Sequence, residues 1–135
     1  MINMSNVNAQ VLQPGQAITF DKVTLKTRNG AECHNQAAPS TVKLCSDGIY
    51  DISFSGNITG AAGATLQIAI AAGGYPLVDT AMNATPAAEN QLVNVFARKL
   101  LHNCCCDLNR ISVVNTGSVP VTIAPNSSLV IIRES

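Results

Sequence analysis

Strict alternation of side chains predicts a strand over residues 48–59, with one buried face and one polar face. One parity carries the apolar residues Tyr50, Ile52, Phe54 and Ile58, and the other carries Asp51, Ser53, Ser55 and Asn57. Successive side chains of a strand point to opposite sides, so this pattern is typical of a half-buried strand. In a chain poor in helical patterns, such a strand indicates an antiparallel sandwich or barrel.

Further short strands are expected along most of the chain, at residues 17–20, 23–25, 42–44, 65–71, 77–78, 111–114, 119–123 and 128–133. Residues 111–114 and 119–123 flank an Asn-Thr-Gly-Ser turn and predict a hairpin. Residues 128–133 are apolar on both parities, which predicts a central strand or one pressed against another subunit. The spacing of these segments is typical of a jelly roll.

Residues 92–101 fit two periodicities. Leu92, Phe96 and Leu100 recur at helical spacing, whereas Val93, Val95 and Ala97 recur at strand spacing. We favour a strand, because β-branched residues are frequent and strands are expected on both sides.

The predicted organisation is an N-terminal arm, residues 1–16, followed by a single jelly-roll domain, residues 17–135. The arm is rich in Asn and Gln and ends in Pro14-Gly15. Residues 31–40 are small and polar and are expected to form a loop. We expect neither a secretory signal nor a membrane span, because no basic segment precedes an apolar run and no apolar run approaches ~20 residues.

Composition adds an expectation of self-association. The net charge is zero, with 8 basic and 8 acidic residues, so no basic surface for nucleic acid is expected. Charged residues make up only 12% of the chain, about half the usual ~25%. Because such a surface solubilises a protein poorly, we expect much of it to be buried between subunits.

The order of several short motifs resembles the tumour-necrosis-factor-like and complement globular-head superfamily. Gly-Ile-Tyr-Asp-Ile-Ser-Phe begins at residue 48, Leu-Gln-Ile-Ala-Ile at 66, Gly-Gly-Tyr-Pro-Leu-Val at 73, Ile-Ser-Val-Val-Asn-Thr-Gly at 111 and Ser-Leu-Val-Ile-Ile-Arg-Glu at 128. Within the superfamily, the likeness is to the bacterial and phage branch, typified by the C-terminal domain of collagen-like spore-surface glycoproteins. The resemblance covers residues 17–133 and implies an all-β antiparallel jelly-roll sandwich assembled as a homotrimer. The chain lacks the collagen stalk of many members, which leaves the mode of anchoring open.

The cysteines and histidines give only weak support for a metal or catalytic site. His102, Cys104 and Cys106 share a parity and are the candidate metal ligands, although three consecutive cysteines do not match the usual zinc spacing. We favour buried thiols or disulfides involving Cys33, Cys45, Cys104, Cys105 and Cys106, with connectivity open. No nucleophile turn or paired carboxylates accompany these residues. We therefore predict no catalytic residue, no cofactor and no enzyme activity.

The resulting hypothesis is a trimeric structural protein of a particle surface, most simply a bacteriophage virion decoration or head-fibre protein on the virion surface. The arm would attach it to a capsid or other particle protein. The candidate trimer contacts are Gln67, Ala69, Ala71, Val93, Val95, Val130 and Ile132. The polar face of residues 48–59 is expected to point away from the trimer axis. Two alternatives remain open: a receptor- or glycan-binding head of a fibre or extracellular spore surface, using Tyr75, and a metal or thiol enzyme at His102 and Cys104 to Cys106.

Overall fold

The longest strand, β6 (Gly48–Thr59), organises the structure. In the computed structural model, which describes residues 2–26, 32–34, 40–44, 47–103 and 110–134, its apolar side chains Tyr50, Ile52, Phe54 and Ile58 are fully buried. The side chains of the opposite parity are half-buried or exposed between Asp51 and Asn57. The predicted half-buried strand is therefore confirmed.

Sheet A is built around β6. Among the described residues it has seven strands, in the order β2-β12-β6-β13-β1-β3, and β10 lies along the other edge of β6. All of these pairings are antiparallel. The strands are β1 (Ile2–Ser5), β2 (Gln10–Leu12), β3 (Lys22–Lys26), β10 (Val93–Asn103), β12 (Val121–Ile123) and β13 (Ser128–Arg133). The favoured strand over residues 92–101 is thus confirmed as β10.

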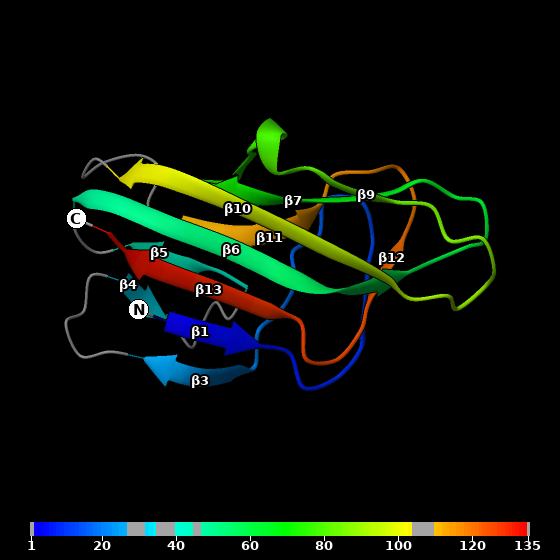
Figure 1. The fold of residues 1–135 in the computed structure, drawn as a ribbon, viewed down its shortest axis with the longest axis horizontal. Coiled ribbons are helices and arrows are strands. Elements are labelled where there is room, and N and C mark those ends of the chain that lie inside the picture. Colours follow the sequence, from blue (N-terminus) through cyan, green and yellow to red (C-terminus); the bar gives the residue numbers. More distant parts are fainter. Residues whose placement is uncertain (1, 27–31, 35–39, 45–46, 104–109, 135) are drawn as a thin grey trace.

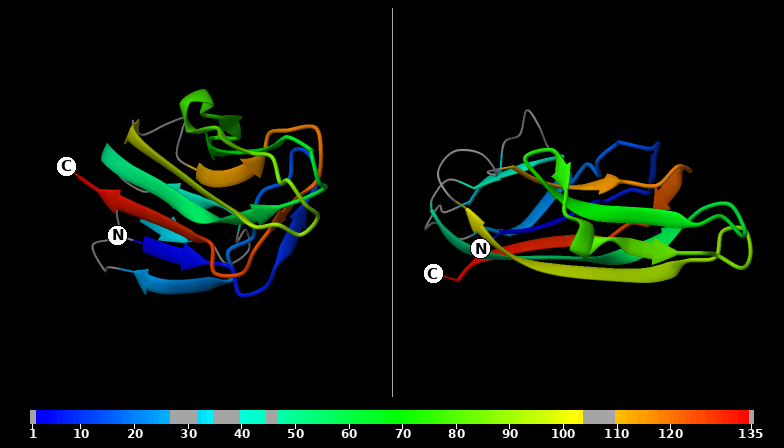
Figure 2. Two further views of the ribbon diagram at one scale, coloured as in Figure 1. Left: turned by 45° about the vertical axis from the view of Figure 1, so that its right-hand side comes forward. Right: turned by 90° about the horizontal axis from the view of Figure 1, so that it is seen from above.

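Sheet B lies over one face of sheet A. It has six strands among the described residues, in the order β4-β5-β11-β7-β8, with β9 also paired to β7. Its elements are β4 (Glu32–His34), β5 (Val42–Leu44), β7 (Leu66–Ala72), β8 (Tyr75–Pro76), β9 (Met82–Ala84) and β11 (Arg110–Asn115). A single helical turn, η1 (Val78–Thr80), connects β8 and β9. Figures 1 and 2 show the two layers and the long β6–β10 pair that runs through the molecule.

Aliphatic side chains fill the space between the sheets, as the composition suggests. The core includes Leu66, Ile68 and Ile70 of β7, all fully buried. Phe20 and Phe54 meet edge to face, with ring centroids 6.5 Å apart and an interplanar angle of 67°. The core therefore joins both sheets into one sandwich.

The N-terminal segment is part of this sandwich and not an arm. β1 pairs with β13 on one side and with β3 on the other. Ile2 and Met4 are fully buried, and Leu12 of β2 is 3% exposed. The prediction of an arm over residues 1–16 is wrong, because alternate side chains of this polar segment complete the core.

Other elements also differ from the sequence expectations. β11 and β12 do not form the expected hairpin, since β11 pairs with β5 and β7 whereas β12 pairs with β2 and β6. β4 lies within the expected loop 31–40. Residues 17–20 form a single bridge, between Ala17 and Val114, instead of a strand. Within the described parts of the chain, no helix is long and apolar enough to span a bilayer.

The side chain of a buried asparagine links the N-terminal segment to the C-terminal part of the chain through hydrogen bonds. Asn6 is fully buried. Its side-chain amide donates to the carbonyl oxygens of Asn8 and Ala124 at 2.9 and 3.0 Å, and its Oδ1 accepts from the Ser127 N–H at 2.9 Å. Buried polar groups need such partners, so this bracket stabilises the fold.

Replacing Asn6 by alanine is expected to destabilise the fold by about 2–3 kcal/mol, because two buried backbone groups lose their partner. Thermal unfolding monitored by circular dichroism should show a fall in Tm of roughly 10 °C. Asn8→Ala is the matched control, since the Asn8 side chain is exposed and only its carbonyl is used. Equal Tm values for the two variants would contradict the role assigned to Asn6.

Candidate functional site

The outward-facing side of sheet A carries exposed apolar side chains on strands whose other side forms the core. On this side, Phe96 is 62% exposed, Leu100 is 56% exposed and Ile132 is 36% exposed. We call this surface the outer face of sheet A. It comprises the outward side chains of β6, β10 and β13, namely Asp51, Ser53, Ser55, Asn57, Asn94, Phe96, Arg98, Leu100, Ser128, Val130 and Ile132.

The strand register arranges this face in rows. Ser55 lies between Phe96 and Ser128, and Asp51 lies between Leu100 and Ile132. Side chains directly opposite one another in antiparallel strands are close neighbours. The surface is therefore recessed along the serines of β6, because their side chains are small. Larger apolar side chains of β10 and β13 lie on either side.

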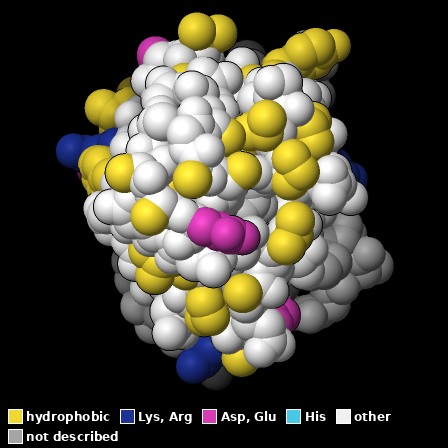
Figure 3. Space-filling view, turned by 90° about the vertical axis from the view of Figure 1, so that its right-hand side faces the viewer, with side chains coloured by type: hydrophobic (Ala, Val, Ile, Leu, Met, Phe, Trp, Pro, Cys, Tyr) yellow, Lys and Arg dark blue, Asp and Glu magenta, His cyan; other side chains and the backbone are white. Residues whose placement is uncertain are grey.

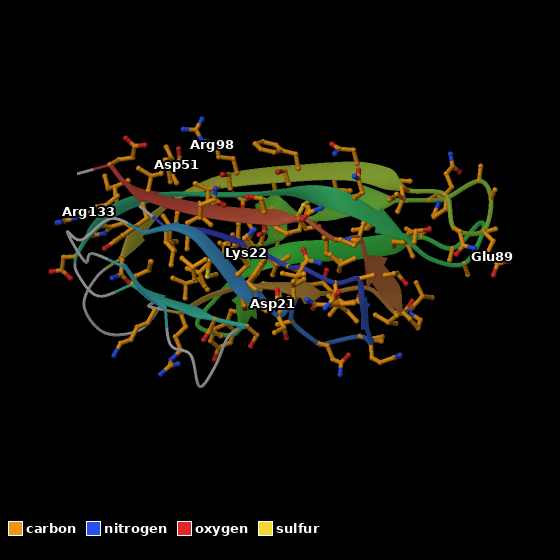
Figure 4. The ribbon with its side chains drawn as sticks, turned by 90° about the horizontal axis from the view of Figure 1, so that it is seen from below. Asp21, Lys22, Asp51, Glu89, Arg98 and Arg133 are labelled. Atoms are coloured by element: carbon orange, nitrogen blue, oxygen red, sulfur yellow. The ribbon has the colours of Figure 1, made fainter. Side chains whose placement is uncertain are left out.

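One ion pair crosses the outer face of sheet A. Arg98 donates from Nε to Asp51 Oδ1 at 2.8 Å and from Nη2 to Asp51 Oδ2 at 2.6 Å. Figure 4 shows the two side chains beside each other on adjacent strands. The hydrogen bond to Asp51, followed by its charge, raises the pKa of Arg98 above its ordinary value. A paired arginine of this kind keeps a fixed direction and can enter an interface with its charge already compensated.

The residues predicted as trimer contacts fall in different places. Ala69, Ala71 and Val95 are 2%, 0% and 6% exposed within their own chain, so their side chains have almost no surface for a partner. These three assignments are wrong as contacts, because sequence alternation alone did not distinguish the chain's own interior from an interface. Val130 and Ile132 do lie on the outer face of sheet A.

The two remaining predicted trimer contacts, Val93 and Gln67, interact with residues of their own chain. Val93 is half-buried and packs against the core. Gln67 Nε2 donates to Asn83 Oδ1 at 3.0 Å, and Gln67 Oε1 accepts from Thr116 Oγ1 at 2.9 Å. These bonds tie β7 to β9 and to the turn after β11.

A second exposed apolar segment surrounds η1. Tyr75 is 73% exposed and Val78 is 88% exposed. An ion pair between Asp79 and Lys99 joins η1 to β10, and the hydrogen bond from Lys99 lowers the pKa of Asp79. Because Asp79 is 62% exposed and Lys99 is partly exposed, this pair positions η1 but contributes little to stability.

The cysteine-rich region lies mostly outside the described residues. Cys45 and Cys104 to Cys106 belong to segments that the structure does not describe, and Cys33 is placed only as a member of β4. His102 lies exposed near the end of β10. Within the described parts of the chain, no three His, Cys, Asp or Glu side chains gather as metal ligands would. The disulfide and metal hypotheses stay predictions.

Solved structures share this fold although their sequences are distant. The Eiger TNF of S. frugiperda superposes with a TM-score of 0.76 at 10% identity, covering 99% of this chain and 91% of that one. The globular domain of zebrafish complement 1qA gives 0.66 at 11% identity, covering 99% and 96%. Murine APRIL at pH 5.0 gives 0.63 at 12% identity, covering 98% of each chain. No protein-family model and no curated protein matches the chain in sequence. The predicted jelly-roll fold of the tumour-necrosis-factor and complement-head type is confirmed, whereas the likeness to a bacterial and phage branch stays a prediction.

Proposed function

We propose that this chain, which folds as tumour-necrosis-factor and complement heads do, is a homotrimeric structural head whose copies meet through the outer face of sheet A. The single observation that carries the proposal is the exposure of Phe96 and Leu100 on a face with almost no net charge. Exposed apolar groups clustered on one face mark interaction sites, and depletion of charge is typical of the core of an interface.

Three copies follow from the family resemblance and fit the shape of the surface. Contacts around a threefold axis join one surface of a copy to a different surface of its neighbour, and the ring closes. The small serine side chains of β6 let a neighbouring copy approach the sheet closely. Phe96 and Ile132 lie on either side of these serines. The Arg98–Asp51 pair would enter the interface already neutralised. This proposal reverses the sequence expectation that the polar face of β6 points away from the axis.

The experiment that tests assembly is light scattering on the purified protein at micromolar concentration. A mass of about three times 14.1 kDa supports the proposal. A mass of one chain at that concentration contradicts it.

We further propose that the trimer is a component of a particle surface, as in a bacteriophage virion decoration or head-fibre protein. A chain with 12% charged residues and zero net charge favours a protein held in an assembly over one that works as a free monomer. Residues 1–16 do not serve as the attachment arm in this proposal, because β1 and β2 belong to the sandwich. Immuno-electron microscopy of the parent particle tests the location. Label on the particle surface supports this assignment, and label absent from intact particles contradicts it.

The alternative is a trimeric head that binds a receptor or glycan. Tyr75 is 73% exposed and Tyr50 is fully buried, so Tyr75 is the tyrosine available as a sugar platform. If Tyr75 is the site, binding to a glycan array should disappear in Tyr75→Ala while the variant keeps its Tm. Unchanged binding by that variant would exclude Tyr75 as the platform.

A further inference from the structure

A groove at the end of the sandwich opposite the chain termini has the character of a ligand site. It has a volume of about 370 Å³, and its walls include Thr59, Gly60, Glu89, Asn90, Val119 and Pro120. Thr59 ends β6, far along that strand from Tyr50, which pairs with Arg133 near the C-terminus. Figure 4 shows Glu89 at this end and Arg133 at the other, and Figure 3 views the end directly, with an acidic side chain near its centre and apolar side chains around it.

Two polar side chains of this groove, Glu89 and Asn90, are exposed, and a third, Thr59, is buried. Thr59 is only 8% exposed, and its buried Oγ1 has no hydrogen-bond partner among the described residues. Within the same described residues, neither the Glu89 carboxylate nor the Asn90 amide forms a side-chain hydrogen bond or ion pair. Buried hydroxyl groups are normally paired, since leaving one unpaired costs free energy. The fold therefore leaves the Thr59 hydroxyl, in the wall of this groove, without a partner among the described residues.

A larger groove along residues 8–21 provides the contrast. Its volume is about 610 Å³, but the side chains of Gln10, Gln16 and Asp21 in its walls already form hydrogen bonds within the chain. The Gln10 side chain bonds both the N–H and the carbonyl of Thr19, and Asp21 Oδ1 accepts from the Val7 N–H at 2.8 Å. These bonds hold the irregular segment between β2 and β3 in place. Three polar side chains of the larger groove thus take part in holding the fold, whereas the buried Thr59 hydroxyl of the smaller groove does not.

We propose that the groove bounded by Thr59 and Glu89 binds a neutral sugar ring. Glu89 is the charged residue of its walls, which disfavours anionic ligands. A carboxylate accepts strong hydrogen bonds from hydroxyl groups, and the Asn90 amide can both donate and accept. Val119 and Pro120 supply an apolar wall for the C–H groups of a ring. A volume of about 370 Å³ lies within the range typical of small-molecule sites.

The groove is shaped by close backbone packing at Gly60. A Cβ at this position would lie 2.7 Å from Leu66 Cδ2 and 3.3 Å from the Pro120 carbonyl oxygen. Glycine therefore allows the end of β6 to approach the segment before β12, and the walls are held by the sandwich itself. All wall residues come from one chain, so the site does not depend on assembly. Failure of sugar binding would leave the trimer proposal intact, and a monomeric protein could still bind sugar.

The test is a titration of isotope-labelled full-length protein with methyl glycosides of glucose, galactose, mannose and N-acetylglucosamine, followed by amide chemical shifts. At least one of these neutral sugars should shift the amides of residues 59–61 and 89–90 with millimolar affinity, whereas N-acetylneuraminic acid should not. A trisaccharide of the same sugar that binds more tightly would identify a glycan chain as the source of the ring, and equal affinity would identify a single residue. Absence of shifts at these amides with all four sugars would overturn the proposal.

Substitutions test whether the sugar binds in this groove and not at another surface. Glu89→Gln should lower the affinity about tenfold, the cost of losing one charge-assisted bond. Thr59→Val should lower the affinity several-fold while keeping or raising the Tm, because valine leaves no unpaired hydroxyl. Asp21→Asn, which alters the larger groove, should leave the affinity unchanged. Binding that survives both Glu89→Gln and Thr59→Val would refute the assignment.

Discussion

Replacing both Phe96 and Leu100 by aspartate is expected to turn the trimer into a folded monomer. Both side chains are more than half exposed within one chain, so the fold loses little when they become polar. In the trimer, each lost apolar side chain removes about 2 kcal/mol of burial. Desolvating the new carboxylates adds several kcal/mol more. The association constant should therefore fall by at least about a thousandfold, since each 1.4 kcal/mol is a factor of ten.

Light scattering and circular dichroism together measure this result. The double variant should have the mass of one chain and an unchanged β spectrum at concentrations where the wild type has about three times 14.1 kDa. Val78→Asp is the matched control, because Val78 is 88% exposed on η1, outside the outer face of sheet A. A double variant that keeps the wild-type mass, or a control that loses it, would contradict the assignment of the interface.

Deleting residues 1–12 is expected to unfold the chain. The deletion removes β1 from between β13 and β3, and it removes β2 from beside β12. Ile2, Met4 and Leu12 are at most 3% exposed, and burial of three such side chains contributes about 6 kcal/mol. A domain of this size is stable by only about 5–15 kcal/mol, so the loss is comparable to the total.

A thermal melt monitored by circular dichroism checks this prediction. The truncated chain should show no cooperative transition, and Met4→Asp should approach the same state. Met4→Leu, which conserves volume, should cost less than about 1.5 kcal/mol. A truncated chain that melts at the wild-type Tm would mean that the N-terminal segment is a detachable arm after all.

The sequence was most informative where one face of a strand is apolar and the other is polar. β6 and β7 could be placed within a residue or two because the period of two is explicit in their side chains. The sequence does not predict β1 although Ile2, Met4 and the buried Asn6 alternate, because asparagine is typical of a surface segment. The bracket formed by Asn6 satisfies groups far away in the chain, and no local pattern reveals it.

Val130 and Ile132 of the candidate interface are among the predicted contacts, but Phe96 and Leu100 of β10 are not, for a different physical reason. An apolar side chain looks the same in a sequence whether it packs into its own core or against a partner. Val95 and Phe96 are neighbours in β10, yet one is 6% exposed and the other is 62% exposed. Only the pairing of β10 with β6 decides which parity points outward. The helical spacing of Phe96 and Leu100 was the available signal, since in a strand the same spacing puts both residues on one face.

The most direct test of the central claim is hydroxyl-radical footprinting of Phe96 at concentrations below and above the association midpoint. If the outer face of sheet A is the contact between copies, oxidation of Phe96 should fall several-fold on assembly. Oxidation of Tyr75, which is 73% exposed at β8, should stay constant and serve as the internal control. Equal oxidation of Phe96 in the monomeric and assembled protein would show that this face stays open to solvent and would contradict the account.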